Sequence, residues 1–84
     1  MIDARRKRLH FRCHHCGMHE NDILFGRLAD DHLAGMSDEQ LDRLETLMEE
    51  NDVDLFNWIT GQSPVPSAFD HDVMKLLQNI NKDL

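Results

Sequence analysis

Apolar residues recur three or four positions apart along most of the chain, in short segments separated by glycine, proline or polar capping residues. This spacing gathers apolar side chains on one face of an α-helix. The chain has no tyrosine and no alternating apolar pattern long enough to predict a β-strand. Five helical segments can be separated in this way. The pattern therefore predicts an all-α fold, a single small five-helix bundle that takes in residues 1–84 as one domain.

The first helical segment is rich in basic residues and ends near a glycine. It is expected over residues 4–15, with Asp3 capping its N-terminus. Leu9 and Phe11 are its main apolar residues, and Gly17 is expected to end it. The basic residues of this segment are interpreted as its solvent-facing side, because runs of charge are usually solvated.

The second and third segments are separated by another glycine. The second is expected over residues 18–33, with Gly35 as its stop. The third has the clearest start in the chain, because Ser37 and Gln40 have the spacing of a capping box. The apolar stripe of the third segment consists of Leu41, Leu44, Leu47 and Met48.

The last two segments are divided by a linker that contains both prolines. Residues 51–54 are expected to cap the fourth segment, which ends at Gly61. Residues 62–66 form the linker, and Ser67 is expected to cap the fifth segment. Trp58 is interpreted as a core anchor, because large aromatic residues dominate small cores. The buried stripe of the fifth segment is expected to be Phe69, Val73, Leu76, Leu77, Ile80 and Leu84.

Length and composition limit the kinds of function that fit. A chain of 84 residues can bury one modest core and does not form a deep cleft between two lobes. Apolar residues make up 40% and charged residues 30%, which is typical of a folded protein. No nucleophile, base and orienting group occur as a recognisable set, so an enzyme is not expected. The composition favours a binding or assembly module.

Charge is divided unevenly along the chain. The residues up to Arg12 carry a net charge of +4 and the remaining residues −11, which together give −7. The acidic remainder would repel a phosphate backbone, and no aromatic residues are interleaved for stacking on bases. Nucleic acid is therefore not expected as a partner, and a mixed-charge surface is better suited to another protein.

The start of the chain and its hydropathy indicate an expected location. Residues 1–8 include four basic residues, but no apolar stretch follows them, so neither a secretory signal nor a transit peptide is expected. No apolar run is long enough to span a bilayer, so direct membrane insertion is not expected either. A cytoplasmic location, in a bacterium, is the simplest expectation.

Both cysteines and four of the six histidines lie near the boundary between the first two segments. Cys13 and Cys16 have the spacing Cys-x-x-Cys, and with His19 they offer three soft ligands for one Zn²⁺ ion. A structural zinc site usually needs ligand pairs from two separate segments, so the favoured interpretation is that no metal binds. On that interpretation Cys13 packs inward, Cys16 is a partly exposed free thiol and the histidines are surface residues.

Three features, taken in order, resemble a known family of small helical proteins. A basic first segment is followed by the motif Gly17-Met18-x-Glu20-x-Asp22-Ile23-Leu24, and later by Asp52-Val53-Asp54-Leu55-Phe56-Asn57-Trp58. Over nearly its whole length the chain resembles the SdhE-like flavinylation and assembly factors of succinate dehydrogenase, to which related mitochondrial assembly factors also belong. Either motif alone is weak, whereas the two together, in a chain of this length, are specific.

The resemblance implies a function as well as a fold. The family consists of five-helix bundles that act as chaperones for the FAD-containing flavoprotein subunit of succinate dehydrogenase or fumarate reductase. They promote covalent attachment of FAD to a histidine of that subunit and supply no catalytic group of their own. The resemblance therefore implies that this chain is a monomer, binds no cofactor stably, and meets FAD through its partner.

The family signature Arg-Gly-x-x-Glu indicates which residues would contact the partner. Gly17 and Glu20 match it, and Asp22 matches the acid that commonly follows, whereas the arginine position holds Cys16. An arginine offers five donors and a fixed charge, and cysteine replaces neither. Arg12, one helical turn earlier, could reach part of the same surface. The predicted partner-binding residues are Arg12, His15, Cys16, Gly17, Met18, Glu20 and Asp22.

A second class of function remains open at this point. The chain could be a small metal- or thiol-dependent protein-interaction module, in which Cys13, Cys16 and His19 matter and Glu20 does not. The metal content of the gently purified protein would separate the two classes.

Overall fold

The computed structural model describes residues 3–84, so the first two residues of the predicted domain lie outside the described part of the chain. Within residues 3–84 every regular element is a helix, which confirms the all-α prediction. The elements are α1 (Ala4–Cys13), α2 (His19–His32), the short 3₁₀ helix η1 (Leu33–Gly35), α3 (Asp38–Leu47), α4 (Asp52–Thr60), the 3₁₀ helix η2 (Ser67–Phe69) and α5 (Asp72–Asp83).

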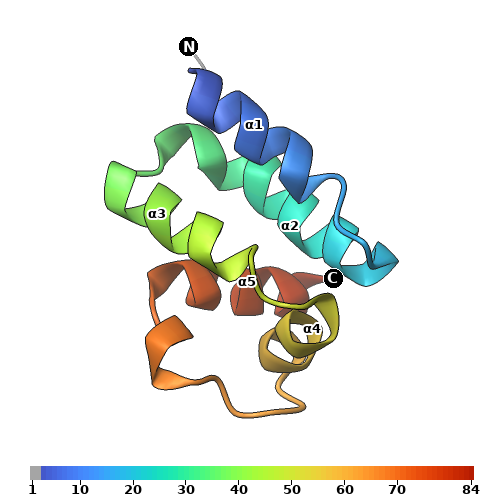
Figure 1. The fold of residues 1–84 in the computed structure, drawn as a ribbon. Helices are drawn as coiled ribbons and strands as arrows, with labels where there is room; N and C mark the ends of the chain where they lie inside the picture. Colours follow the sequence, from blue (N-terminus) through green and yellow to red (C-terminus); the bar gives the residue numbers. More distant parts are fainter. Residues whose placement is uncertain (1–2) are drawn as a thin grey trace.

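Helix α2 is the centre of the bundle. It lies beside α1 and also contacts α4 and α5, while α3 packs against α5 (Figure 1). Each helix contributes its apolar stripe to one core, as the periodicity predicts. The buried apolar residues are Leu9, Cys13, Leu24, Phe25, Leu28, Ala29, Leu33, Met36, Leu41, Leu44, Leu47, Leu55, Trp58, Ile59, Val73, Met74, Leu77 and Ile80.

Helix starts and stops follow their local signals in the middle of the chain. Ser37 and Gln40 form the predicted capping box at the start of α3, each side chain bonded to the other residue's backbone N–H. The Asn51 side chain caps α4 by accepting a hydrogen bond from the Asp54 N–H. Gly61 ends α4 with φ of 82°, a left-handed conformation that favours glycine.

The predicted start of the fifth helix is wrong. Ser67 begins the short helix η2, and the backbone of Asp70 then leaves the helical region. Helix α5 starts at Asp72, and its N-cap is His71, whose Nδ1 accepts a hydrogen bond from the Met74 N–H. Leu84, expected in the buried stripe, follows the end of α5 and is 59% exposed.

One expectation about the first helix needs correction, and its two main apolar residues lie on different faces. Leu9 is buried but Phe11 is 62% exposed, because residues two positions apart lie about 200° apart around a helix and cannot both face the core. Arg5 and Arg6, expected to face solvent, are only partly exposed. Arg5 Nε donates to Glu45 of α3 at 2.8 Å, and Arg6 Nε donates to the Leu33 carbonyl at 3.2 Å, so these two arginines join α1 to its neighbours.

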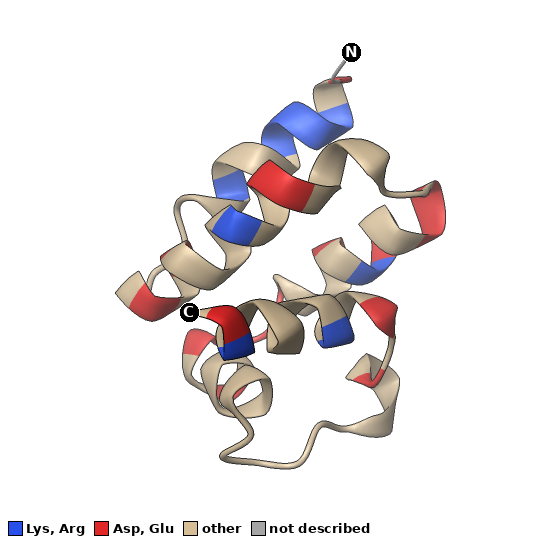
Figure 2. Cartoon of the chain, turned by 180° about the vertical axis from the view of Figure 1, so that it is seen from behind, with Lys and Arg blue, Asp and Glu red and all other residues tan. Residues whose placement is uncertain are grey.

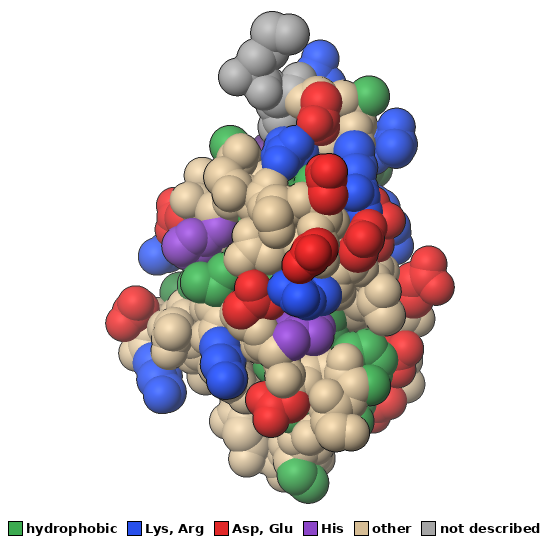
Figure 3. All heavy atoms as spheres, turned by 90° about the vertical axis from the view of Figure 1, so that its left-hand side faces the viewer, with side chains coloured by type: hydrophobic (Ala, Val, Ile, Leu, Met, Phe, Trp, Pro, Cys, Tyr) green, Lys and Arg blue, Asp and Glu red, His purple; other side chains and the backbone are tan. Residues whose placement is uncertain are grey.

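Lys7, Arg8 and Arg12 remain on the solvent side of α1, as predicted. Basic residues are closely spaced along α1, whereas acidic residues are distributed over the rest of the chain (Figure 2). On the face shown in Figure 3, side chains of both signs are interspersed. None of the helices within residues 3–84 combines the length and the apolar character that crossing a bilayer requires.

The His71 cap predicts a specific dependence of stability on pH. Burial lowers the pKa of His71, so the folded state favours the neutral ring whose Nδ1 accepts the Met74 N–H. The unfolded chain takes up a proton near pH 6.5, before the folded protein does, so this contribution to stability is present above that pH and is lost as the pH falls below it.

We expect His71→Asn, which keeps a good capping group but does not titrate, to reduce the loss of stability between about pH 7.5 and 5.5. Urea unfolding at a series of pH values measures the effect. Equal pH dependence in the wild type and the variant would contradict it.

Candidate functional site

The corner between α1 and α2 is built from side chains that close the end of α1. Helix α1 ends at Cys13 and not at His15, and Gly17 does not adopt a left-handed conformation. The backbone N–H groups of His14 and His15 donate to the last carbonyls of α1. Two side chains add to this: His15 Nδ1 donates to the Phe11 carbonyl at 2.7 Å, and the Cys16 thiol lies 3.6 Å from the carbonyls of Arg12 and Cys13. His15 and Cys16 therefore help to cap the C-terminal end of α1.

The two cysteines occupy different environments, as the metal-free interpretation predicts. Cys13 is fully buried with its sulfur 3.9 Å from that of Met48, and Cys16 is partly exposed; both are free thiols. Burial raises the pKa of Cys13 to about 12. Burial, followed by the charges of Asp22 and Asp52, raises the pKa of Cys16 to about 11. Neither thiol is poised to act as a thiolate near neutral pH.

The sulfur and imidazole groups proposed as metal ligands are not brought together. Cys16 lies beyond the end of α1, so the two cysteines do not share a helix face with exposed sulfurs. His19 is exposed at the first position of α2. Within residues 3–84, the group whose ligand atoms lie within 4.8 Å of one another is a different one, formed by His10, His14 and Asp30.

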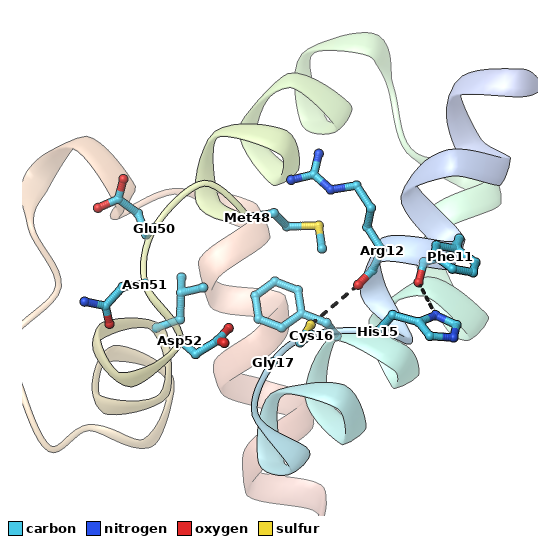
Figure 4. Close-up of a pocket in the computed structure, with 11 residues that line it drawn as sticks. Phe11, Arg12, His15, Cys16, Gly17, Met48, Glu50, Asn51 and Asp52 are labelled. Atoms are coloured by element: carbon cyan, nitrogen blue, oxygen red, sulfur yellow. Dashed lines mark hydrogen bonds between the residues drawn. The ribbon is translucent and has the colours of Figure 1, made fainter.

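A pocket of about 460 Å³ opens between the end of α1 and the connection from α3 to α4 (Figure 4). Its apolar side includes Phe25, Met48 and Leu55, and its polar side includes Arg12 and Asp52. In Figure 4 the Arg12 side chain extends over the pocket toward Met48. The Asp52 carboxylate points into the pocket from the opposite wall. The lining residues are Phe11, Arg12, His15, Cys16, Gly17, Phe25, Met48, Glu50, Asn51, Asp52 and Leu55.

Gly17 allows the two walls of this pocket to approach closely. A Cβ atom added at Gly17 would lie 2.6 Å from Asp52 Oδ2, so any larger residue would displace the Asp52 side chain. The fully buried Asn21 fixes the same junction, because its Nδ2 donates to the Asp52 carbonyl at 2.9 Å. The first turn of α2 is thereby tied to the first turn of α4.

The predicted partner-binding residues fall into two adjoining groups. Four of them, Arg12, His15, Cys16 and Gly17, line the pocket. The remaining three lie on the adjoining start of α2, where Met18 is the N-cap and the two acidic residues occupy the first turn; these three are Met18, Glu20 and Asp22.

Glu20 and Asp22, the two acidic residues in the first turn of α2, differ in exposure. Glu20 is exposed and makes no ion pair with any residue in the described range, so its carboxylate is available to a partner. Asp22 is half-buried, and its Oδ1 atom is enclosed without a hydrogen-bond partner among residues 3–84. Both carboxylates lie where the helix N-terminus favours negative charge.

Sequence reasoning missed the opposite wall of the pocket. The sequence pattern places Met48 in the core stripe of the third helix and predicts Asn51 and Asp52 as capping residues. Phe11, one of the main apolar residues of the first segment, is exposed, and its ring stacks on His15 with centroids 4.0 Å apart. No local pattern signals that residues 11–17 meet residues 48–55, because this contact depends on how the helices pack.

Comparisons with known proteins agree in pointing to one family. A family model described as "Flavinator of succinate dehydrogenase" matches residues 7–81. The chain is 36% identical over 78 residues to "Succinate dehydrogenase assembly factor 2, mitochondrial" of Dictyostelium discoideum, which covers 93% of this chain and 55% of that protein. It is also 36% identical over 84 residues to the protein of the same description from Danio rerio, covering 98% of this chain and 53% of the relative.

Two consequences follow from these matches. The chain spans about half the length of the curated relatives that it matches. Their descriptions also contradict the cytoplasmic location expected from the sequence, because these relatives are named as mitochondrial proteins. The expected location is corrected accordingly: the relatives point to mitochondria, and composition around the first residues was a poor guide.

Proposed function

Because the chain belongs to the family of flavinators of succinate dehydrogenase, we propose that it is an assembly factor that binds the flavoprotein subunit of succinate dehydrogenase and promotes covalent attachment of FAD to it. The observation that carries the proposal is the match of the family model over residues 7–81, nearly the whole chain. The relatives themselves are named as succinate dehydrogenase assembly factors.

The proposed role is that of a chaperone and not of an enzyme. The protein binds the flavoprotein subunit in a conformation where the flavin and its acceptor histidine are aligned, and binding energy shifts the subunit toward that conformation. FAD belongs to the partner, and this chain holds no cofactor stably in the proposal. The high pKa values of Cys13 and Cys16 favour this role over a thiol-dependent interaction module.

The pocket and the start of α2 form the proposed docking surface. The apolar surface of the pocket, formed by the exposed Phe11 and the partly exposed Met48, can accept an apolar group of the partner. Around it, the charges of Arg12 and Glu20 can fix the orientation of the partner by pairing with complementary groups.

Cys16 takes the place of the family's arginine within this surface. Its thiol lies near the carboxylates of Asp22 and Asp52, whose charges raise its pKa. Among residues 3–84, no arginine forms an ion pair with either carboxylate, so a basic group of the partner is assigned to that position. Arg12, which lines the same pocket, provides the positive charge from this side.

The flavoprotein subunit of fumarate reductase is a second proposed client, because the resemblance covers both enzymes. We further propose that the protein acts as a monomer bound to one flavoprotein subunit.

Glu20→Ala provides the direct test of the docking surface. We expect the variant to bind the flavoprotein subunit at least about tenfold more weakly, since removing one partner of a charged interfacial pair commonly costs 2 kcal/mol or more. Titration of the purified flavoprotein subunit by calorimetry measures the dissociation constant.

Asp31→Ala is the matched control, because Asp31 is another exposed acid of α2 outside the pocket and outside its first turn. It should bind as the wild type does. Equal affinity of Glu20→Ala and Asp31→Ala would remove Glu20 from the interface, and no measurable binding by the wild type would contradict the proposed function.

A further inference from the structure

A second cluster of polar side chains lies between α1 and α2, apart from the pocket. His10 lies on α1, and His14, one turn later, is the C-cap residue of that helix. Both histidines direct their Nε2 atoms to the same oxygen of Asp30 on α2. The distances to Asp30 Oδ1 are 3.1 Å from His10 and 3.0 Å from His14. The two rings have centroids 4.6 Å apart, and the three ligand atoms all lie within 4.8 Å of one another.

Helix α2 carries a space for one of these rings. Gly26 is buried in the interior of α2, where glycine costs about 1 kcal/mol relative to alanine in helix propensity. A Cβ atom at Gly26 would lie 2.9 Å from both Cε1 and Nδ1 of His14. The glycine therefore lets the His14 ring lie against α2, where its Nε2 reaches Asp30.

Two of the three spacings between the ligand atoms are compatible with the ligand shell of a transition metal, and all three are within 4.8 Å. Zinc binds histidine nitrogen and carboxylate oxygen at about 2.0–2.2 Å, so two ligand atoms in a tetrahedral shell lie about 3.3 Å apart. The two nitrogen–oxygen distances of 3.0 and 3.1 Å are within a few tenths of an ångström of that value. Imidazole and carboxylate together suit Zn²⁺ better than the all-oxygen preference of Mg²⁺ or Ca²⁺.

From this convergence we propose that His10, His14 and Asp30 form a binding site for Zn²⁺ or a chemically similar divalent transition metal ion. The three residues occupy three positions of a tetrahedral shell, and water takes the fourth, because the site is open to solvent. The bound ion joins α1 to α2 and stabilises their pairing.

This site is separate from the Cys13, Cys16 and His19 set considered from the sequence. It takes one histidine from each of two successive helical turns and its third ligand from another helix. The proposal does not depend on the proposed role in flavinylation, because metal binding is measured on the isolated protein.

The test is a titration of the chelator-treated protein with zinc sulfate by calorimetry. Long-range ¹H–¹⁵N spectra of the imidazole rings identify which histidines respond. We expect one Zn²⁺ per chain, selective shifts at His10 and His14, and a higher Tm with the ion bound. His14→Asn and Asp30→Asn should each weaken the affinity at least about tenfold.

Three further variants make the result specific. Gly26→Ala retains all three ligands but displaces the His14 ring, and should also weaken binding. His32→Asn, at an exposed histidine near the end of α2, and Cys16→Ser should leave the affinity unchanged within about twofold. Circular dichroism without metal verifies that each variant is folded. Absence of saturable binding, binding that survives Asp30→Asn and His14→Asn, or binding that is lost in Cys16→Ser would overturn the proposal.

Discussion

Replacing Gly17 with leucine is expected to weaken binding of the flavoprotein subunit strongly while the protein remains folded. Even a Cβ atom at this position would approach Asp52 Oδ2 to 2.6 Å, so a leucine displaces Asp52 and covers one edge of the pocket. Gly17 is exposed and its φ is not positive, so the substitution requires no strained backbone. We expect the dissociation constant to rise by about two orders of magnitude, or close to 3 kcal/mol.

The chain offers a matched control for this substitution. Gly35 is also exposed, its φ is not positive, and a Cβ atom there would meet nothing within 4 Å. Gly35→Leu should therefore bind the flavoprotein subunit as the wild type does. Circular dichroism and calorimetry on both variants separate folding from binding, and wild-type affinity in Gly17→Leu would show that the pocket is not the docking surface.

The largest expected effect on stability comes from Leu28→Ala. Leu28 has no exposed surface and belongs to α2, which contacts α1, α4 and α5. Removing a fully buried leucine side chain costs about 2–5 kcal/mol, through lost burial and the cavity that remains. The free energy of unfolding of a small domain is only about 5–15 kcal/mol, so this variant should lose a large part of its stability.

Urea unfolding followed by the fluorescence of Trp58, the one tryptophan, measures this loss. Ile23→Ala is the control on the same helix, because Ile23 is 44% exposed and its truncation should change the free energy of unfolding by only about 0.5 kcal/mol. A loss below 1 kcal/mol for Leu28→Ala would mean that α2 is not the centre of the core.

Local signals were sufficient to predict most of the fold. The Ser37 capping box, the Asn51 cap and the Gly61 stop each act within a few residues, and the structure has all three. The start of α5 could not be predicted in this way, because Ser67 is a preferred N-cap residue, whereas His71, which caps α5 in the structure, is not. The backbone at Asp70 leaves the helical region between them, and no local sequence signal indicates this break.

The candidate site could be predicted only along the segment that carries the family motif. Gly17 was marked by that motif, but the reason for a glycine there is the approach of Asp52, which lies 35 positions away in the sequence. The histidines illustrate the same limit. His14 was grouped with neighbours in sequence, whereas in the fold it faces Asp30 across the α1–α2 interface.

The most direct test of the central claim is covalent FAD on the flavoprotein subunit of succinate dehydrogenase, measured by its fluorescence in a denaturing gel. Cells that lack the gene for this chain are compared with cells in which the wild type or Gly17→Leu has been restored. We expect covalent FAD to fall on deletion, to return with the wild type and not to return with Gly17→Leu. Covalent FAD that is unchanged by the deletion would contradict the assignment of this chain as a flavinylation factor.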